Sequence, residues 1–117
     1  MGQPIVHLEI IGRDAPRLHA FYRDLFGWDV GPASGPEMGW YALSAAASSG
    51  IDVGIGQAPG NQTRVTAYVR VPDLQVAVDR AVELGGSVMM PPTSVPGGPT
   101  LAIVGDPDGN ATGLMAG

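Results

Sequence analysis

The sequence contains no cysteine and no lysine, and it has no long uninterrupted apolar run. Without cysteine the chain can form no disulfide, and it offers neither a thiol nucleophile nor a thiolate metal ligand. No apolar run approaches the ~20 residues that a membrane-spanning helix needs. Eleven acidic residues against six arginines give a net charge of -5, and the arginines are not clustered. We therefore expect a cytoplasmic protein that binds neither membranes nor nucleic acid.

The two halves of the chain follow one template. Shifting the numbering by 59 residues brings apolar, acidic and glycine positions of the first half onto like positions of the second, without a gap. The matched pairs are Val6 and Val65, Ile10 and Val69, Asp14 and Asp73, Leu25 and Leu84, Gly27 and Gly86, Gly50 and Gly109, and Gly54 and Gly113. Because 117 residues suffice for one core and not for two independent ones, residues 1–117 are predicted to form a single domain.

Each half is predicted to run from a strand through a helix to further strands. Apolar and polar residues alternate in the first strand, an aspartate suits the helix N-cap, and a glycine suits the helix C-terminus. These features are residues 6–10, Asp14 and Gly27 in the first half, and residues 65–71, Asp73 and Gly85 in the second. The further strands are predicted at residues 28–30, 40–44, 51–56, 87–90, 100–104 and 111–115, with residues 45–50 as a turn, 57–62 as a joint and 91–99 as a loop. His19, one position past Leu18 of the apolar stripe, is predicted to lie at the surface.

Several stretches resemble one known superfamily. They are the strand around His7, FYRDLFGW at residues 21–28, VPDLQVAVDRAVELGG at residues 71–86, and DPDGN at residues 106–110 followed by a strand. With these features the chain resembles the vicinal oxygen chelate superfamily, which includes glyoxalases, bleomycin resistance proteins and extradiol dioxygenases. The resemblance implies an α+β fold (the glyoxalase/bleomycin resistance/dihydroxybiphenyl dioxygenase fold). Two tandem βαβββ modules, about residues 4–56 and about 63–116, would form a curved mixed sheet around a cup.

The resemblance also implies four metal-ligand positions, one on the first and one on the last strand of each module. In this sequence they are His7, Gly54, Thr66 and Gly113, of which only His7 is a competent ligand. A catalytic cation normally needs about three protein ligands. The alternative set, His7 with Glu9 and Asp52, would hold a divalent metal if the strand around Asp52 shifted its register.

The remaining positions on the cup face are predicted to line a ligand pocket. They are Trp40 or Tyr41, Thr66, Tyr68, Arg70, Met89 or Met90, and Met115, beside the small Gly54, Gly56 and Gly113. Glycines leave space, and aromatic and methionine side chains give an adaptable apolar wall. This mixture suits a small, partly aromatic or amphiphilic organic molecule, although such side chains on strands are more often plain core.

The leading functional hypothesis is a glyoxalase-like protein that binds a small molecule without a metal, for drug or metabolite sequestration, as a homodimer. The homodimer is implied by the resemblance. The alternative is a metal-dependent enzyme of the same superfamily, a lyase, isomerase or dioxygenase that uses His7 with Glu9 or Asp52. His7 is then the candidate general base, although a polar side chain on the cavity wall without a catalytic role is the more common case. A third possibility is a pure interaction module with a filled cup.

Overall fold

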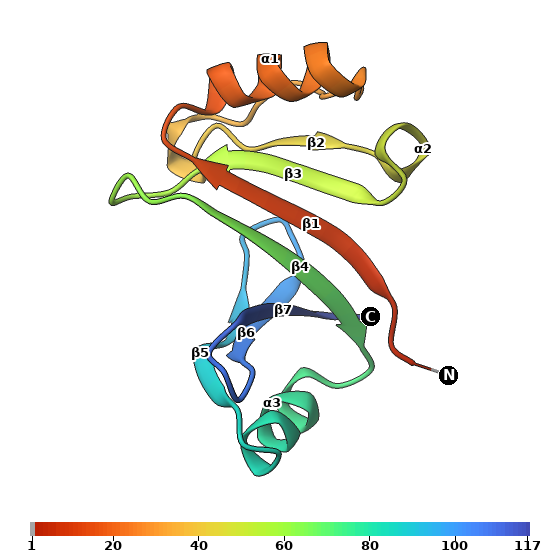
Figure 1. Ribbon diagram of the computed structural model, residues 1–117, viewed down its shortest axis with the longest axis vertical. Helices are drawn as coiled ribbons and strands as arrows, with labels where there is room; N and C mark the ends of the chain where they lie inside the picture. Colours follow the sequence, from red (N-terminus) through yellow and green to blue (C-terminus); the bar gives the residue numbers. More distant parts are fainter. Residues whose placement is uncertain (1) are drawn as a thin grey trace. The chain divides into compact units, whose positions relative to one another are not determined.

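The computed structural model of the chain describes residues 2–117 as seven strands, three α-helices and one 3-10 helix (Figure 1). In chain order the elements are β1 (Ile5–Gly12), α1 (Ala15–Phe26), η1 (Pro36–Met38), β2 (Ala42–Ser44), α2 (Ala46–Ser49), β3 (Asp52–Gln57), β4 (Arg64–Val71), α3 (Leu74–Glu83), β5 (Ser87–Ser94), β6 (Thr100–Gly105) and β7 (Ala111–Ala116). The predicted α+β class is confirmed. Over the described residues, no helix combines the length and the apolar character that crossing a bilayer requires.

The chain divides into two compact units, described separately. The first unit comprises His7–Val65, and the second comprises Thr66–Gly117 with the N-terminal residues through Val6. In the first unit the strands lie in the order β2-β3-β1. β1 pairs in parallel with β3, and β2 pairs antiparallel with β3. The core of this unit gathers apolar side chains of the three strands, of α1 and of the segments beside them, namely Ile10, Val30, Ala42, Val53 and Ile55, with Leu8, Leu18, Tyr22, Trp28 and Ile51 packed against them.

Helix α1 begins and ends where the sequence predicts. The Asp14 side chain accepts a hydrogen bond from the Arg17 amide at 3.2 Å, and Gly27 closes the helix in the left-handed conformation at φ 70°. The prediction that His19 lies at the surface is wrong. Its side chain is buried, and its Nε2–H donates to the carbonyl of Ile55 on β3 over 2.8 Å. A helix residue beside the apolar stripe can therefore face the sheet and satisfy its polar atom there.

Two other expectations for the first unit need correction. The strand expected at residues 28–30 is reduced to one isolated antiparallel bridge between Val30 and Ser44. The turn expected at residues 45–50 contains the short helix α2, whose first amide, from Ala46, donates to Asp52 Oδ1 at 2.8 Å. Asp52 therefore serves as a capping residue for α2.

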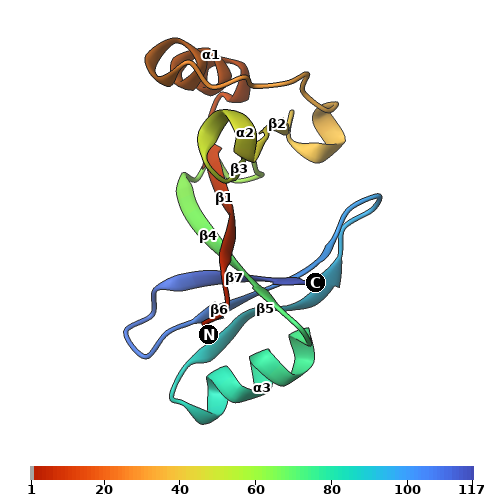
Figure 2. The same ribbon diagram turned by 90° about the vertical axis from the view of Figure 1, so that its right-hand side faces the viewer.

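In the second unit the strands lie in the order β4-β7-β6-β5. β4 pairs in parallel with β7, and β6 pairs antiparallel with both β5 and β7. Helix α3 starts at its predicted N-cap, Asp73, and runs along one face of β5, β6 and β7 (Figure 2). The core between them consists of Val71, Leu74, Val78, Ala102, Val104 and Leu114.

Strand β5 is longer than predicted. It continues through Pro91 and Pro92 to Ser94, so the first part of the expected loop at residues 91–99 is extended strand. Its pairing with β6 shifts register between Val88 and Met90 and again between Met90 and Thr93. The second shift spans the two prolines, which have no amide hydrogen to donate to the neighbouring strand.

Candidate functional site

Strand β1 carries two polar side chains, His7 and Glu9, on one face within the first unit. The parallel register with β3 places Asp52 opposite His7 and Gly54 opposite Glu9. Because side chains alternate along a strand and paired residues share a face, these four positions lie together. They lie on the side of β1 opposite to that of the core residue Ile10. The predicted grouping of His7, Glu9 and Asp52 on one face is therefore present.

Tyr41 reaches this face from the segment that precedes β2. Its hydroxyl lies 2.9 Å from His7 Nε2, and it donates to Glu9 Oε2 over 3.3 Å. Arg64 Nη2 donates to the other carboxylate oxygen of Glu9, Oε1, at 3.1 Å. The Glu9 side chain is only 13% exposed. We call these four side chains, His7, Tyr41, Glu9 and Arg64, the His7 network.

The Tyr41 ring occupies the space above two glycines of β3. A Cβ built on Gly54 would overlap the hydroxyl and the ring carbons of Tyr41. A Cβ on Gly56 would lie 2.9 Å from Tyr41 Cδ1 and 3.0 Å from the carbonyl oxygen of Gly39. The glycine at position 54, expected to leave an empty ligand position, instead makes room for a tyrosine.

The backbone before β2 fixes the direction of Tyr41. Gly39 and Trp40 both have positive φ angles, 66° and 55°. Gly39 lies so close to the Gln57 backbone that a side chain there would overlap it. The Tyr41 amide donates to Ser34 Oγ at 2.9 Å, and the Ser34 amide donates to the Tyr41 carbonyl at 2.8 Å. Of the two aromatic candidates, Tyr41 therefore joins the His7 network, whereas Trp40 remains 39% exposed.

The surroundings of His7 favour its neutral form. Burial holds the pKa of His7 below its ordinary value, and the nearby carboxylates of Glu9 and Asp52 oppose this effect only in part. A neutral imidazole has one nitrogen that donates a hydrogen bond and one that accepts. The hydrogen-bonded pair of His7 and Tyr41 can therefore exchange a hydrogen bond or a proton with a bound molecule.

The side chains of the alternative metal set are already bound within the protein. Tyr41 contacts both His7 and Glu9, Arg64 holds the second oxygen of Glu9, and Asp52 caps α2. Among residues 2–117, no group of three His, Asp or Glu side chains has a geometry that could hold a cation. The donor set that a divalent metal needs is therefore not assembled in this arrangement.

The remaining predicted site residues lie in the second unit. Tyr68 and Thr66 are buried on β4, and the register with β7 places Gly113 opposite Tyr68 and Met115 opposite Arg70. A Cβ on Gly113 would overlap the Tyr68 ring. The glycine beside a tyrosine thus recurs in both units. The structure brings Tyr68, Arg70 and Met115 onto one face, whereas Met89 on β5 is half exposed.

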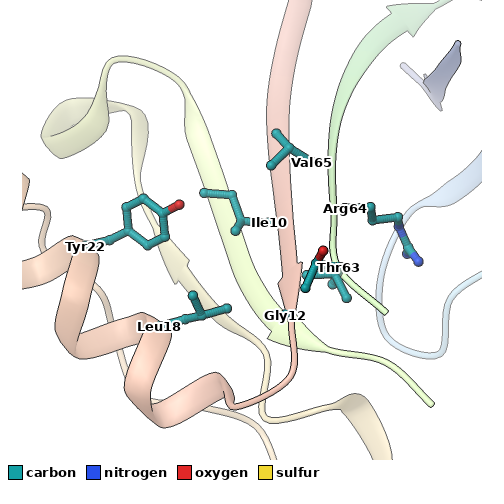
Figure 3. A pocket seen from close by; sticks show the side chains of 8 residues that line it. Ile10, Gly12, Leu18, Tyr22, Thr63, Arg64 and Val65 are labelled. Carbon is teal, nitrogen blue, oxygen red and sulfur yellow. The ribbon is translucent and has the colours of Figure 1, made fainter. Parts of the chain in front are cut away.

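A shallow hollow of about 380 Å³ opens on the core side of β1 in the first unit (Figure 3). Leu18 and Tyr22 of α1 line it, together with side chains at the C-terminal end of β1 and at the start of β4. The other lining residues are Ile10, Ile11, Gly12, Thr63, Arg64 and Val65. Arg64 belongs both to this hollow and to the His7 network.

Sequence reasoning missed two features of this region. Arg64 was not expected beside Glu9, and Tyr41 was expected to line a pocket rather than to bond to His7 and Glu9. One sequence signal was available for Tyr41. Gly54 and Gly56 are two residues apart on a strand, so both lie on the face of His7, and two glycines in that arrangement indicate a bulky neighbour.

Comparison with known proteins defines the family. The model of the glyoxalase-like domain matches residues 7–115, so the chain belongs to the glyoxalase-like domain family. The candidate glyoxylase CFP32 of Mycobacterium tuberculosis, and its counterpart in Mycobacterium bovis, are 31% identical over 100 residues, which cover 80% of this chain. The chain spans only 38% of the length of those relatives.

Solved structures confirm the predicted fold. The methylmalonyl-CoA epimerase of Mycobacterium tuberculosis aligns with a TM-score of 0.69 at 16% identity, over 96% of this chain and 86% of that chain. A hypothetical protein of Bacillus halodurans aligns with a TM-score of 0.76 at 12% identity, over 100% and 96%. A glyoxalase/bleomycin resistance protein/dioxygenase superfamily member of Vibrio splendidus aligns with a TM-score of 0.68 at 17% identity, over 99% and 100%. At these identities the likeness establishes the fold alone.

Proposed function

We propose that this glyoxalase-like chain binds a small organic molecule at the His7 network, for sequestration of a drug or metabolite. The observation that carries the proposal is the Tyr41 hydroxyl between His7 Nε2 and the Glu9 carboxylate. Small-molecule sites fix the orientation of their ligands with a small number of polar groups held in place, as the Tyr41 hydroxyl is held here. The predicted lining residues Thr66, Tyr68, Arg70, Met89 and Met115 remain candidate ligand-binding residues of the second unit.

The proposal is tested by screening ligands against the wild-type chain and two site variants. The panel contains CoA esters, suggested by the epimerase neighbours, and neutral, cationic and anionic aromatic compounds. Tyr41→Phe removes one hydrogen bond and should weaken a bound compound roughly 5- to 10-fold, because such a bond contributes about 1–1.5 kcal/mol. His7→Ala should weaken it at least as much. Arg17→Ala, an exposed change on α1, is the matched control and should leave the Kd unchanged.

Isothermal titration calorimetry gives the Kd values, and protein NMR locates the site. Chemical-shift changes should centre on β1, β3 and the segment before β2. Binding that is equally strong in Tyr41→Phe, His7→Ala and Arg17→Ala would place the ligand elsewhere. Failure of every compound class to bind would argue against a small-molecule site.

A second candidate function is an enzyme of the same superfamily, a lyase, isomerase or oxidoreductase, that uses His7 as its general base. The lowered pKa of His7 favours it, because a mainly neutral imidazole can accept a proton near neutral pH. The name of CFP32 makes glyoxalase substrates the first to assay. Turnover should fall as the pH drops through the pKa of His7, and His7→Ala should abolish it. Turnover that survives in His7→Ala would exclude this mechanism.

The domain organisation, assembly and location of the chain are also proposals. From length, composition and charge we propose that residues 1–117 fold as a single domain in the cytoplasm, with neither nucleic acid nor membrane as a partner. On the superfamily resemblance we propose that the chain forms a homodimer. Sedimentation velocity measures the assembly. A single species with the mass of one chain, about 12.0 kDa, at micromolar concentration would contradict the homodimer.

A further inference from the structure

We infer that the Tyr41 side chain occupies the space that a metal centre would need, so that the Tyr41 phenol, rather than a cation, binds the ligand. The inference rests on the proposed site at the His7 network. Its first support is steric, since no side chain can be added at Gly54 without overlapping the Tyr41 hydroxyl and ring. The position that faces Glu9 on β3 therefore cannot supply a carboxylate or an imidazole while Tyr41 stays where it is.

The second support is the set of hydrogen bonds that hold this arrangement. A cation at this face would have to separate His7 Nε2 from the Tyr41 hydroxyl, and it would compete with Tyr41 and Arg64 for the Glu9 oxygens. Asp52 would have to leave the first amide of α2. Each of these polar groups is at least partly shielded from water or holds part of the fold in place. Breaking several of their hydrogen bonds together is therefore unfavourable.

The charge of the site indicates the chemistry of its ligand. Within the first unit, the carboxylates of Glu9 and Asp52 lie on the same strand face as His7, and Arg64 supplies one compensating cation. A divalent metal would attract ligands that carry anionic oxygens or a chelating pair of oxygens. The side chains of the His7 network offer such ligands no positive charge beyond that of Arg64. The ligand class that fits is a neutral or cationic organic molecule that exchanges hydrogen bonds with the Tyr41 phenol and with His7.

The test reconstructs a metal site by removing the ring and adding a carboxylate. In the double variant Tyr41→Ala/Gly54→Glu, a new carboxylate at position 54 joins His7 and Glu9, which gives about the three protein ligands that a cation needs. The matched control is Tyr41→Ala/Leu43→Glu. Leu43 is paired with Gly54 across β2 and β3 and is exposed, so its carboxylate lies on the same face one strand further away.

Metal content is measured by mass spectrometry after dialysis against nickel, zinc or manganese. The double variant with Gly54→Glu should retain near one equivalent per chain and should lose it when His7→Ala is added. The wild-type chain, Tyr41→Phe, Gly54→Glu alone and the Leu43→Glu control should retain no stoichiometric metal. Tyr41→Phe is included because it keeps the ring in place and preserves packing. It should also change the imidazole nitrogen shifts of His7 in NMR spectra, since it removes the hydroxyl that His7 contacts.

Three results of the metal measurements would overturn the inference. They are one equivalent of metal in the wild-type chain that His7→Ala removes, metal binding by Gly54→Glu alone without loss of stability, and a folded double variant that binds no metal. If the double variant does not fold, unchanged His7 shifts in Tyr41→Phe would equally overturn it. The proposed function fails separately, when no compound in the ligand panel binds although these metal results hold. A protein that binds anionic compounds more tightly than matched neutral and cationic ones would contradict the inferred ligand class.

Discussion

The buried contact between His19 and Ile55 gives a sharp prediction about stability. His19→Ala removes the Nε2–H that donates to the Ile55 carbonyl over 2.8 Å, and it also removes an imidazole that is only 6% exposed. A carbonyl that loses its buried donor costs about 1–3 kcal/mol, and the unfilled space adds roughly 1 kcal/mol or more. We therefore expect the free energy of unfolding to fall by about 2–4 kcal/mol, a large part of the ~5–15 kcal/mol of a typical domain.

The prediction is measured by urea denaturation monitored through tryptophan fluorescence. His19→Gln should recover most of the loss, because the glutamine amide nitrogen can reach nearly the same place as the imidazole Nε2 and donate to the same carbonyl. Arg17→Ala, an exposed change two residues earlier on α1, is the control and should cost under about 0.5 kcal/mol. If His19→Ala is no more destabilising than Arg17→Ala, or if His19→Gln rescues nothing, the buried hydrogen bond does not stabilise the fold.

The cap of α1, the imidazole of His7 and the glycine beside Tyr68 provide further tests. Asp14→Ala removes the N-cap acceptor and should cost about 1 kcal/mol of unfolding free energy; an unchanged urea midpoint would contradict this. Burial lowers the pKa of His7, so between this value and its ordinary 6.5 the unfolded chain binds more protons. The contribution of His7 to the free energy of unfolding should be complete above pH 6.5 and should be lost as the pH falls through that window. The slope of the free energy of unfolding against pH in that window should vanish in His7→Gln. Gly113→Ala should cost about 1–3 kcal/mol because its Cβ overlaps the Tyr68 ring, and the loss should shrink when Tyr68→Ala is combined with it.

The repeated elements could be predicted from the sequence because their signals are local. Asp14, Gly27 and Asp73 act within one turn of their own helices, and the alternation in β1 and β4 is visible over a few residues. The same local reasoning failed in α2, where four small residues form a helix whose first amide is capped by Asp52, six positions after Ala46. Local patterns thus locate a helix well when its capping residue is adjacent to the helix in the sequence.

The candidate site could be predicted only in part, because its geometry depends on contacts between distant residues. The positions of His7, Glu9 and Gly54 on one face follow from strand alternation and from the repeat. The contact between His7 and Tyr41 joins residues 34 positions apart, and that between Glu9 and Arg64 joins residues 55 positions apart. No periodicity encodes such pairs. His19 was misplaced for a similar reason, since its partner, the Ile55 carbonyl, belongs to the backbone and leaves no trace in the sequence.

The two prolines in β5 have a consequence for how the sheet ends. β5 is the last strand in the order β4-β7-β6-β5, so its outer side would otherwise offer a row of backbone groups to any extended polypeptide. Successive residues of a strand direct their amides to opposite sides, so Pro91 and Pro92 together remove one donor from each side. The outer edge is therefore interrupted where a continuous ladder would have to form. This arrangement disfavours edge-to-edge pairing of β5 with a second copy of the chain at the position of the two prolines.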